Sequence, residues 1–255
     1  MSDPTFRSFA APDVSVPAAD VLDAIVADAG PVPADRPRTI GVMVASVDGH
    51  ATVDGRSGGL GNPADRAIFR GLRERADALL VGPTTLNRER YSTTLDPDQR
   101  ERRVAAGRNP EPLLATVSRS LAIERDLPLF QEDVLRVAVY TASDEQPDWD
   151  PERVDVVRLD PATPATALRD LHDRGIAHVN CEGGPTLLAG LVRDGLLDEL
   201  LLTVSPLLVG SDPTLGNLLP IVHGSVGDQP RSLELRGVWR SDDMLFLHYH
   251  LGSSA

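Results

Sequence analysis

Residues 179–188 read Val-Asn-Cys-Glu-Gly-Gly-Pro-Thr-Leu-Leu, and this stretch decides the fold. An apolar strand ends there, Gly183 and Gly184 allow a tight turn, and Pro185 suits the first position of a helix. The first turn of such a helix presents free N–H groups and the positive end of its dipole to an anion. Open α/β sheets bind their ligands at this carboxyl edge. Taken alone, the stretch favours a plain strand-to-helix turn, with an anion site as its alternative.

Strands and helices alternate on both sides of this turn. Continuous apolar runs predict buried strands, which we expect at residues 39–46, 78–81, 113–117, 135–140, 154–157, 176–181 and 200–205. Helices are expected from Asn62-Pro63 onward and at residues 165–174 and 185–194. The alternation predicts an α/β three-layer fold with a mostly parallel central sheet. The last two strands, residues 232–239 and 244–251, are joined by a tight turn and are therefore expected to form an antiparallel C-terminal hairpin.

Residues 1–37 differ in composition from the rest, because they are rich in Ala, Pro and Asp. One amphipathic stretch, residues 18–29, is expected to form a short helix that the following prolines end. We interpret residues 1–37 as an N-terminal strap and residues 38–255 as one domain.

The composition excludes several classes of function. The 255 residues contain 25 arginines, no lysine and 38 acidic residues, which gives a net charge of −13. Without lysine the chain cannot use Schiff-base chemistry or a P-loop, and its acidic balance argues against a nucleic-acid partner. The single cysteine, Cys181, excludes an internal disulfide and a multi-cysteine zinc site, and we expect an inert core thiol. With no signal peptide and no membrane-spanning run, we expect a cytoplasmic protein without a membrane partner.

Two further strand ends suit anions. Gly82-Pro-Thr84-Thr85 follows one expected strand, and Thr84 or Thr85 is expected to cap the next helix. Ser118-Arg119 follows another, where a hydroxyl and a forked guanidinium suit a phosphate monoester. Three such strand ends in one sheet are harder to explain as turns alone. Pyrophosphate plus one further phosphate is what NADP carries, so NADP is the cofactor that the pattern predicts.

Several of these blocks together resemble a known family. They are Ser46-Val-Asp48-Gly49, Val81-Gly-Pro-Thr-Thr85, Ser118-Arg119, Cys181-Glu-Gly-Gly-Pro-Thr-Leu-Leu188, Leu197-Asp-Glu-Leu200 and Ser205-Pro-Leu-Leu-Val-Gly210. Over about residues 38–250 the chain is similar to the riboflavin-biosynthesis pyrimidine reductase family, which has a dihydrofolate-reductase-like fold. The chain looks like the stand-alone actinobacterial type of this family. The His-x-Glu and Cys-x-x-Cys of the deaminase half found in bifunctional relatives do not occur in it.

The resemblance implies an NADPH-dependent oxidoreductase of riboflavin biosynthesis. Hydride would pass to the ribosyl C1 carbon, held as an imine, of a 5-amino-6-(phosphoribosylamino)uracil-type intermediate. By position, Ala45 and Ser46 would border the nicotinamide, and Ser118 and Arg119 would hold the 2′-phosphate. The implied cofactor contacts are Ala45, Gly82, Thr85, Ser118, Arg119, Gly183, Gly184, Thr186 and Leu187.

Two carboxylates are the catalytic candidates that the resemblance implies. Asp48 would shape or polarise the nicotinamide and substrate pocket, or else only form the Asp-Gly turn. Glu182 would reach the substrate's ribose hydroxyls, or else cap a helix. The implied substrate contacts are Ser46, Asp48, Asn62, Asp65, Arg66 and Glu182.

Residues 62–66 suggest an alternative activity. Their Pro-Ala-Asp resembles the opening of the substrate helix in dihydrofolate reductases, where the aspartate protonates the pterin. Asp65 would then serve a dihydrofolate-type or other small-molecule NADPH reductase, or else only favour the first helical turn. A nucleotide-binding module without activity, and a flavin or deazaflavin in place of NADPH, remain open alternatives.

No metal is needed for this chemistry. His248 and His250 share a strand face, but no carboxylate stands at a suitable spacing, so we expect edge or interface packing rather than a metal site. Family members are commonly homodimers, and Trp239 and Phe246 are expected at that interface.

Overall fold

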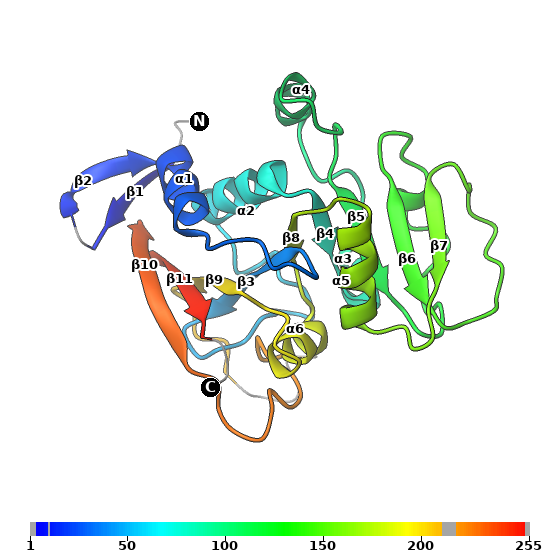
Figure 1. Cartoon of the computed structure of the whole chain (residues 1–255). Coiled ribbons are helices and arrows are strands. Elements are labelled where there is room, and N and C mark those ends of the chain that lie inside the picture. The colour runs from blue at the N-terminus through cyan, green and yellow to red at the C-terminus, as the bar shows by residue number, and fades with distance from the viewer. Residues whose placement is uncertain (1–3, 10, 211–217, 253–255) are drawn as a thin grey trace.

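The computed structural model describes residues 4–9, 11–210 and 218–252. In this part of the chain one sheet of eleven strands runs in the order β2-β1-β10-β11-β9-β3-β8-β4-β5-β6-β7 (Figure 1). The strands are β1 (Thr5–Ser8), β2 (Ala11–Pro17), β3 (Arg38–Ser46), β4 (Ala78–Leu80), β5 (Leu113–Val117), β6 (Val137–Thr141), β7 (Val154–Arg158), β8 (His178–Cys181), β9 (Glu199–Ser205), β10 (Leu233–Ser241) and β11 (Met244–Leu251). The helices are α1 (Ala18–Asp28), α2 (Pro63–Arg75), α3 (Pro83–Glu89), α4 (Pro97–Ala105), α5 (Pro164–Asp173) and α6 (Pro185–Arg193).

The sheet confirms the predicted fold class. The strands from β9 to β7 pair in parallel, because helical crossovers join most of them. The strands from β2 to β11 are antiparallel and continue the sheet beyond β9. The C-terminal hairpin of β10 and β11 is as predicted. No helix within the described residues combines the length and the apolar character needed to cross a membrane.

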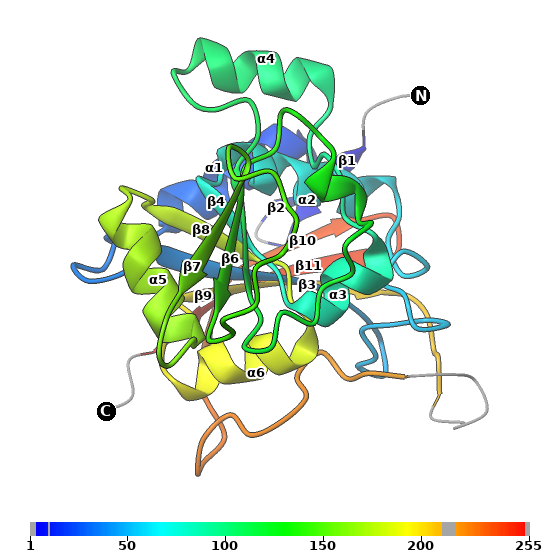
Figure 2. The ribbon, with the colours of Figure 1, turned by 90° about the vertical axis from the view of Figure 1, so that its right-hand side faces the viewer.

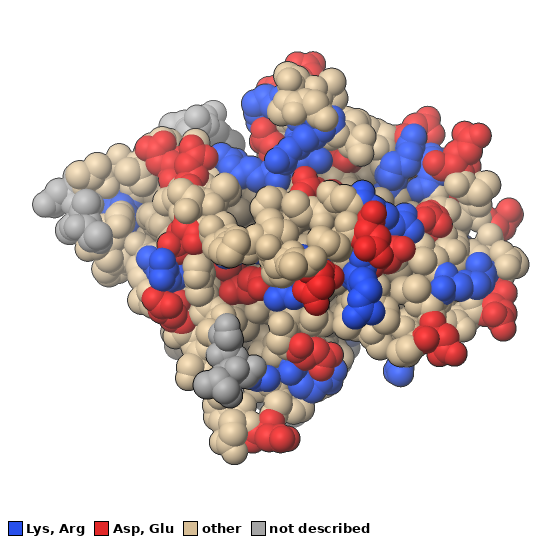
Figure 3. Space-filling model, in the orientation of Figure 1, with Lys and Arg blue, Asp and Glu red and all other residues tan. Residues whose placement is uncertain are grey.

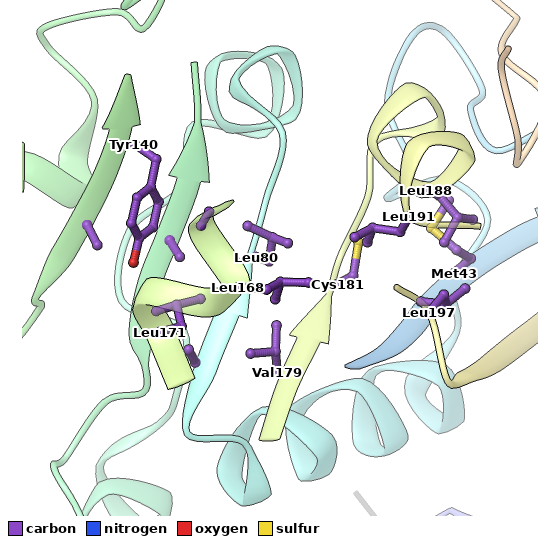
Figure 4. Packing of buried hydrophobic residues seen from close by; sticks show 14 of the residues in the cluster. Met43, Leu80, Tyr140, Leu168, Leu171, Val179, Cys181, Leu188, Leu191 and Leu197 are labelled. Carbon is purple, nitrogen blue, oxygen red and sulfur yellow. The ribbon is translucent and has the colours of Figure 1, made fainter. Parts of the chain in front are cut away.

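Helices cover both faces of the sheet. Figure 1 and Figure 2 show α1 and α2 on one side and α6 on the other. The cluster on the α5 and α6 side contains Leu168, Leu171, Leu188 and Leu191, with Cys181 in its middle (Figure 4). Cys181 is fully buried, and burial raises the pKa of its thiol to about 12, so the prediction of an inert core thiol is confirmed.

Local sequence sets where the helices begin. α2 starts as predicted, with Pro63 at its first position and the Asn62 side chain accepting a hydrogen bond of 3.0 Å from the Asp65 amide. The prediction that Thr84 or Thr85 caps α3 is wrong. Pro83 takes the first helical position, which makes Gly82 the N-cap and leaves both threonines inside the first turn.

The N-terminal segment adds strands that the sequence did not predict. β1 pairs with β10, and the Phe6 ring meets the Phe246 ring edge-on at 5.1 Å. Phe246 is fully buried and Trp239 nearly so, in a cluster that α1 and α2 also contribute to. The expectation that these two aromatics form a dimer interface is therefore wrong, because the protein's own N-terminal segment covers them.

The same segment changes the surroundings of the two histidines. Asp28, at the end of α1, lies beside His248 and His250 on β11. The prediction that no carboxylate accompanies the pair is therefore wrong. Sequence spacing could not show this contact, since more than two hundred residues separate Asp28 from the histidines.

Candidate active site at the carboxyl edge of the sheet

The predicted cofactor contacts lie at or just after the ends of four adjacent strands. β3, β8, β4 and β5 are parallel neighbours, so the segments after them lie along one edge of the sheet. Ala45 and Ser46 end β3, and Gly183 follows β8. Gly82 follows β4, and Ser118 follows β5. The structure thus places these residues in a row along the edge where open α/β sheets bind ligands.

Backbone contacts join the segment after β4 to the segment after β8. The Gly82 amide donates a hydrogen bond of 2.7 Å to the Gly183 carbonyl. A Cβ on Gly184 would lie 2.8 Å from the Thr85 hydroxyl oxygen, closer than van der Waals contact allows. Gly183 has a φ of +81°, a backbone conformation that residues with side chains disfavour. The glycines are therefore required by this loop-to-loop contact.

The first turn of α6 opens onto the same edge. Gly184 is its N-cap and Pro185 its first residue, and no side chain among the described residues caps it. Thr186 and Leu187 occupy the next two positions, where helical amides have no partner inside the helix. This helix end has the geometry that suits a phosphate group.

Ser118 and Arg119 have different surroundings. Ser118 is buried, and its hydroxyl accepts a hydrogen bond of 3.0 Å from the Ala122 amide, which shapes the turn after β5. Arg119 is exposed, and its guanidinium makes no ion pair or hydrogen bond with the described residues. Of the two, Arg119 is the one whose donors are free for a ligand.

Asp48 holds together two segments at the end of β3. It accepts hydrogen bonds from the Ser46 hydroxyl at 2.5 Å, from the Gly210 amide at 2.7 Å and from the Val209 amide at 3.2 Å. The Ser46 hydroxyl, followed by these amides, lowers the pKa of Asp48 far below its ordinary value. The carboxylate is therefore ionised at neutral pH.

Asp48→Asn is expected to loosen the segment after β9. An amide oxygen accepts more weakly than a carboxylate, so hydrogen exchange at the Val209 and Gly210 amides will become faster. In the wild type, the lowered pKa means that protection persists as the pH falls below about 3.9, the ordinary value for aspartate, and is lost only at still lower pH. Exchange measured by NMR at pH 7 and at about pH 3, below the ordinary aspartate pKa, checks this, and equal rates in the two proteins would contradict it.

Glu182 lies inside the protein. Its oxygens accept two hydrogen bonds of 2.7 Å from Arg73 on α2 and one of 2.7 Å from the Tyr91 hydroxyl. The Glu182 side chain is 1% exposed, and the Arg73 guanidinium also lies over the Phe69 ring at 4.2 Å. The carboxylate thus fastens α2 and the end of α3 to the segment after β8, and does not face open space.

The pKa shifts of Arg73 and Tyr91 are consistent with their close contact with Glu182. Burial would lower the pKa of Arg73, but the charge of Glu182 outweighs it and raises the pKa above its ordinary value. Burial, reinforced by Glu182, raises the pKa of Tyr91 well above its ordinary value. At neutral pH Arg73 is therefore a charged guanidinium and Tyr91 a neutral phenol.

The first turn of α2 lies next to β9. Burial raises the pKa of Asp65, although a hydrogen bond from Thr203 opposes the rise. Arg66 is exposed beside it. A pocket of about 280 Å³ adjoins this turn and is lined by residues 59–62, 205–207 and 242–244. Asn62 lines the pocket in addition to capping α2.

Several contacts of the site had no signal in the sequence. Arg73 and Tyr91, which bind Glu182, belong to no motif that the sequence analysis singled out. The amides of Val209 and Gly210 fall in the block Ser205–Gly210, but nothing in that block pointed to Asp48 as their partner. Contacts between residues that are distant in the sequence depend on the tertiary fold, which local sequence patterns do not reveal.

Relatives with known names match most of the chain. A 2,5-diamino-6-ribosylamino-4(3H)-pyrimidinone 5′-phosphate reductase of Archaeoglobus fulgidus is 26% identical over 181 residues, which cover 69% of this chain and 83% of the relative. The riboflavin biosynthesis protein RibD of Aquifex aeolicus is 24% identical over 186 residues, 72% of this chain and 50% of that protein.

Solved structures share the fold. A pyrimidine reductase-like protein from Corynebacterium diphtheriae superposes with a TM-score of 0.68 at 24% identity, covering 91% of this chain and 99% of that one. A Thermotoga maritima deaminase/reductase, named for 5-amino-6-(5-phosphoribosylamino)uracil reduction, gives 0.70 at 22% identity and covers 85% and 57%. The model of the RibD C-terminal domain matches residues 37–246, so the chain belongs to the RibD C-terminal domain family, as its motifs predicted.

Proposed function

We propose that this protein is an NADPH-dependent reductase of riboflavin biosynthesis. Its substrate is a ribosylaminopyrimidine phosphate, the class of compound in the name of the Archaeoglobus relative. The observation that carries the proposal is the row of strand ends at β3, β8, β4 and β5, with an uncapped helix end and an unpaired guanidinium along it. The homodimer and the cytoplasmic location expected from the sequence belong to this proposal too.

The described residues fit NADPH. The amides at the start of α6 suit its pyrophosphate, and the free guanidinium of Arg119 suits its 2′-phosphate. Ala45 and Ser46 end the next strand beyond β8, which leaves them for the nicotinamide. When bound, the cofactor supplies the hydride that the substrate's C1 carbon takes up.

The protein's own groups have defined tasks in this proposal. Ser46 and the ionised Asp48 are hydrogen-bonded to each other at the end of the site assigned to the nicotinamide. The negative charge of Asp48 favours a cationic imine carbon there. Asp48 does not serve as an acid, because its pKa is lowered. We assign Glu182 to positioning, since its oxygens bind Arg73 and Tyr91. The exposed Arg66 in the first turn of α2 is assigned to the substrate phosphate.

The direct test combines the purified protein, NADPH and the ribosylaminopyrimidine phosphate. Consumption of NADPH together with a product two hydrogens heavier supports the proposal. The same assay with dihydrofolate, and with NADH in place of NADPH, supplies the comparisons. Binding of NADPH without turnover of any aminopyrimidine or pterin would instead support a nucleotide-binding module without activity.

Asp65 favours one second candidate, a dihydrofolate-type reductase. Its raised pKa and its place in the first turn of α2 suit a carboxyl group that takes up a proton more readily than an ordinary aspartate does. Asp65→Asn separates the two activities. Loss of dihydrofolate turnover with intact aminopyrimidine turnover would favour the second candidate.

The same variant has an expected effect on stability. A raised carboxyl pKa means that the folded state resists ionisation, so wild-type stability falls as the pH rises from about 3.9 through the raised value. Asp65→Asn keeps the shape and an acceptor for Thr203 without the buried charge. We therefore expect the variant to unfold at a higher temperature than wild type at pH 8, and this difference to vanish at pH 3. A lower Tm than wild type at pH 8 would contradict this account.

A further inference from the structure

Asp28, His248 and His250 form a cluster far from the candidate active site. The two histidines are on β11, and Asp28 ends α1, which packs on that face of the sheet. β11 pairs with β9 so that His250 lies opposite Glu199, at the start of β9, whereas the active-site edge is at Ser205. Six residues of strand separate these ends, which is about 20 Å.

The side chains of this cluster converge. One ligand atom of each residue lies within 4.8 Å of the other two. His250 Nε2 is 3.2 Å from Asp28 Oδ2, and His248 Nδ1 is 3.9 Å from the same oxygen. Ligands bound tetrahedrally to zinc at about 2.0–2.2 Å stand about 3.4 Å apart, so small side-chain rotations would bring all three onto one ion.

Glu199 determines which ring nitrogen of His248 donates a hydrogen bond. His248 Nε2 lies 2.6 Å from Glu199 Oε2, and an ionised carboxylate only accepts, so Nε2 carries the proton of this bond. In the neutral ring, the lone pair of Nδ1 then points toward another acceptor, Asp28. A histidine held by a carboxylate on one nitrogen, with the other free, is the usual arrangement of a metal ligand.

His250 supplies a second, independent observation. Its Nε2 is buried and makes no hydrogen bond within the described residues, despite the short distance to Asp28. Buried polar atoms without partners are rare in folded proteins and call for an explanation. An ion between His250 and Asp28 would give this nitrogen its partner.

The charges around the cluster favour a cation. Asp28 and Glu234 both bind Arg236, and Glu199 binds Arg38. Three carboxylates therefore face two guanidiniums, which leaves one negative charge in excess. Arg236 is at the surface and binds both oxygens of Asp28, Oδ2 at 3.0 Å and Oδ1 at 2.7 Å. Each oxygen accepts one of these bonds, so Oδ2 retains a lone pair for another partner.

We propose that Asp28, His248 and His250 bind one divalent transition-metal ion, with zinc the best suited and water as the fourth ligand. Two imidazoles and one carboxylate select such ions over magnesium or calcium, which prefer oxygen ligands. The ion fastens the end of α1 to β11 and takes no part in the reductase chemistry at the opposite edge.

The test uses the full-length, tag-free protein after treatment with a chelator. Titration calorimetry with Zn²⁺ and visible absorption with Co²⁺ are expected to show one site per wild-type chain. His250→Ala and Asp28→Asn will each weaken binding by about tenfold or more. The matched control is His178→Ala, because His178 also faces a carboxylate, Asp77 at 3.5 Å, but has no second histidine. This control keeps the wild-type affinity.

Thermal unfolding gives a readout that does not depend on the binding signal. Zn²⁺ is expected to raise the Tm of wild type and His178→Ala equally, and to raise that of Asp28→Asn by clearly less at the same Zn²⁺ concentration. Each variant's metal-free Tm shows that it is folded. No stoichiometric binding by wild type, or equal binding by wild type, His250→Ala and Asp28→Asn, overturns the proposal. Loss of binding in His178→Ala also overturns it.

Discussion

Arg119→Ala is expected to raise the KM for NADPH by about 10- to 150-fold and to leave the KM for NADH unchanged. A hydrogen-bonded charge pair contributes about 1.5–3 kcal/mol, and only NADPH carries the 2′-phosphate that would make this pair. Arg119 is exposed and has no partner among the described residues, so it loses no internal contact when NADPH binds. Steady-state kinetics with both nucleotides measures the change.

Arg169→Ala is the matched control for this experiment. Arg169 is also an exposed arginine, on α5, and its removal changes the net charge by the same amount. It is expected to leave both KM values unchanged. If Arg119→Ala retains the wild-type preference for NADPH, the 2′-phosphate assignment fails, although the reductase activity itself can still hold.

The largest expected effect on stability comes from Arg73→Ala. Removing this guanidinium leaves the buried carboxylate of Glu182 with only the Tyr91 hydroxyl, and an uncompensated buried charge costs about 3–5 kcal/mol. We therefore expect the free energy of unfolding to fall by about that amount, measured by urea denaturation at pH 7.

A neighbouring arginine provides the comparison. Arg75, on the same helix, pairs with an exposed carboxylate, Asp23, and Arg75→Ala is expected to cost no more than about 1 kcal/mol. Equal losses from the two variants would mean that the Glu182 cluster is not the strong contact that its burial indicates. Glu182→Gln tests the same cluster from the other side.

The elements that sequence predicts best are those whose signals are local. The apolar runs of β3 and β5, the Asn62-Pro63 start of α2 and the glycine turn at residues 183–184 all appear as expected. Each depends on the propensity of a few adjacent residues. Thr84 and Thr85 show the limit of such reasoning, because a neighbouring proline decided which residue became the cap.

The contacts that sequence misses join distant residues. Glu182 and Arg73 are 109 residues apart, and Asp28 and His248 are farther apart still. No periodicity encodes which side chain a carboxylate will meet after folding. β2 was missed for a different reason. Its proline and aspartate residues disfavour strands, and what stabilises it is pairing with the strand β1 and packing of Val16 against the core cluster.

The N-terminal segment changes where this protein can be divided. Similarity to the family begins at residue 37, yet Phe6 and the apolar face of α1 belong to the same core cluster as Phe246. A chain that began where the similarity starts would expose a hydrophobic surface beside β10 and α2, and such surfaces promote aggregation. The region that matches the family and the hydrophobic core of the protein therefore begin at different residues.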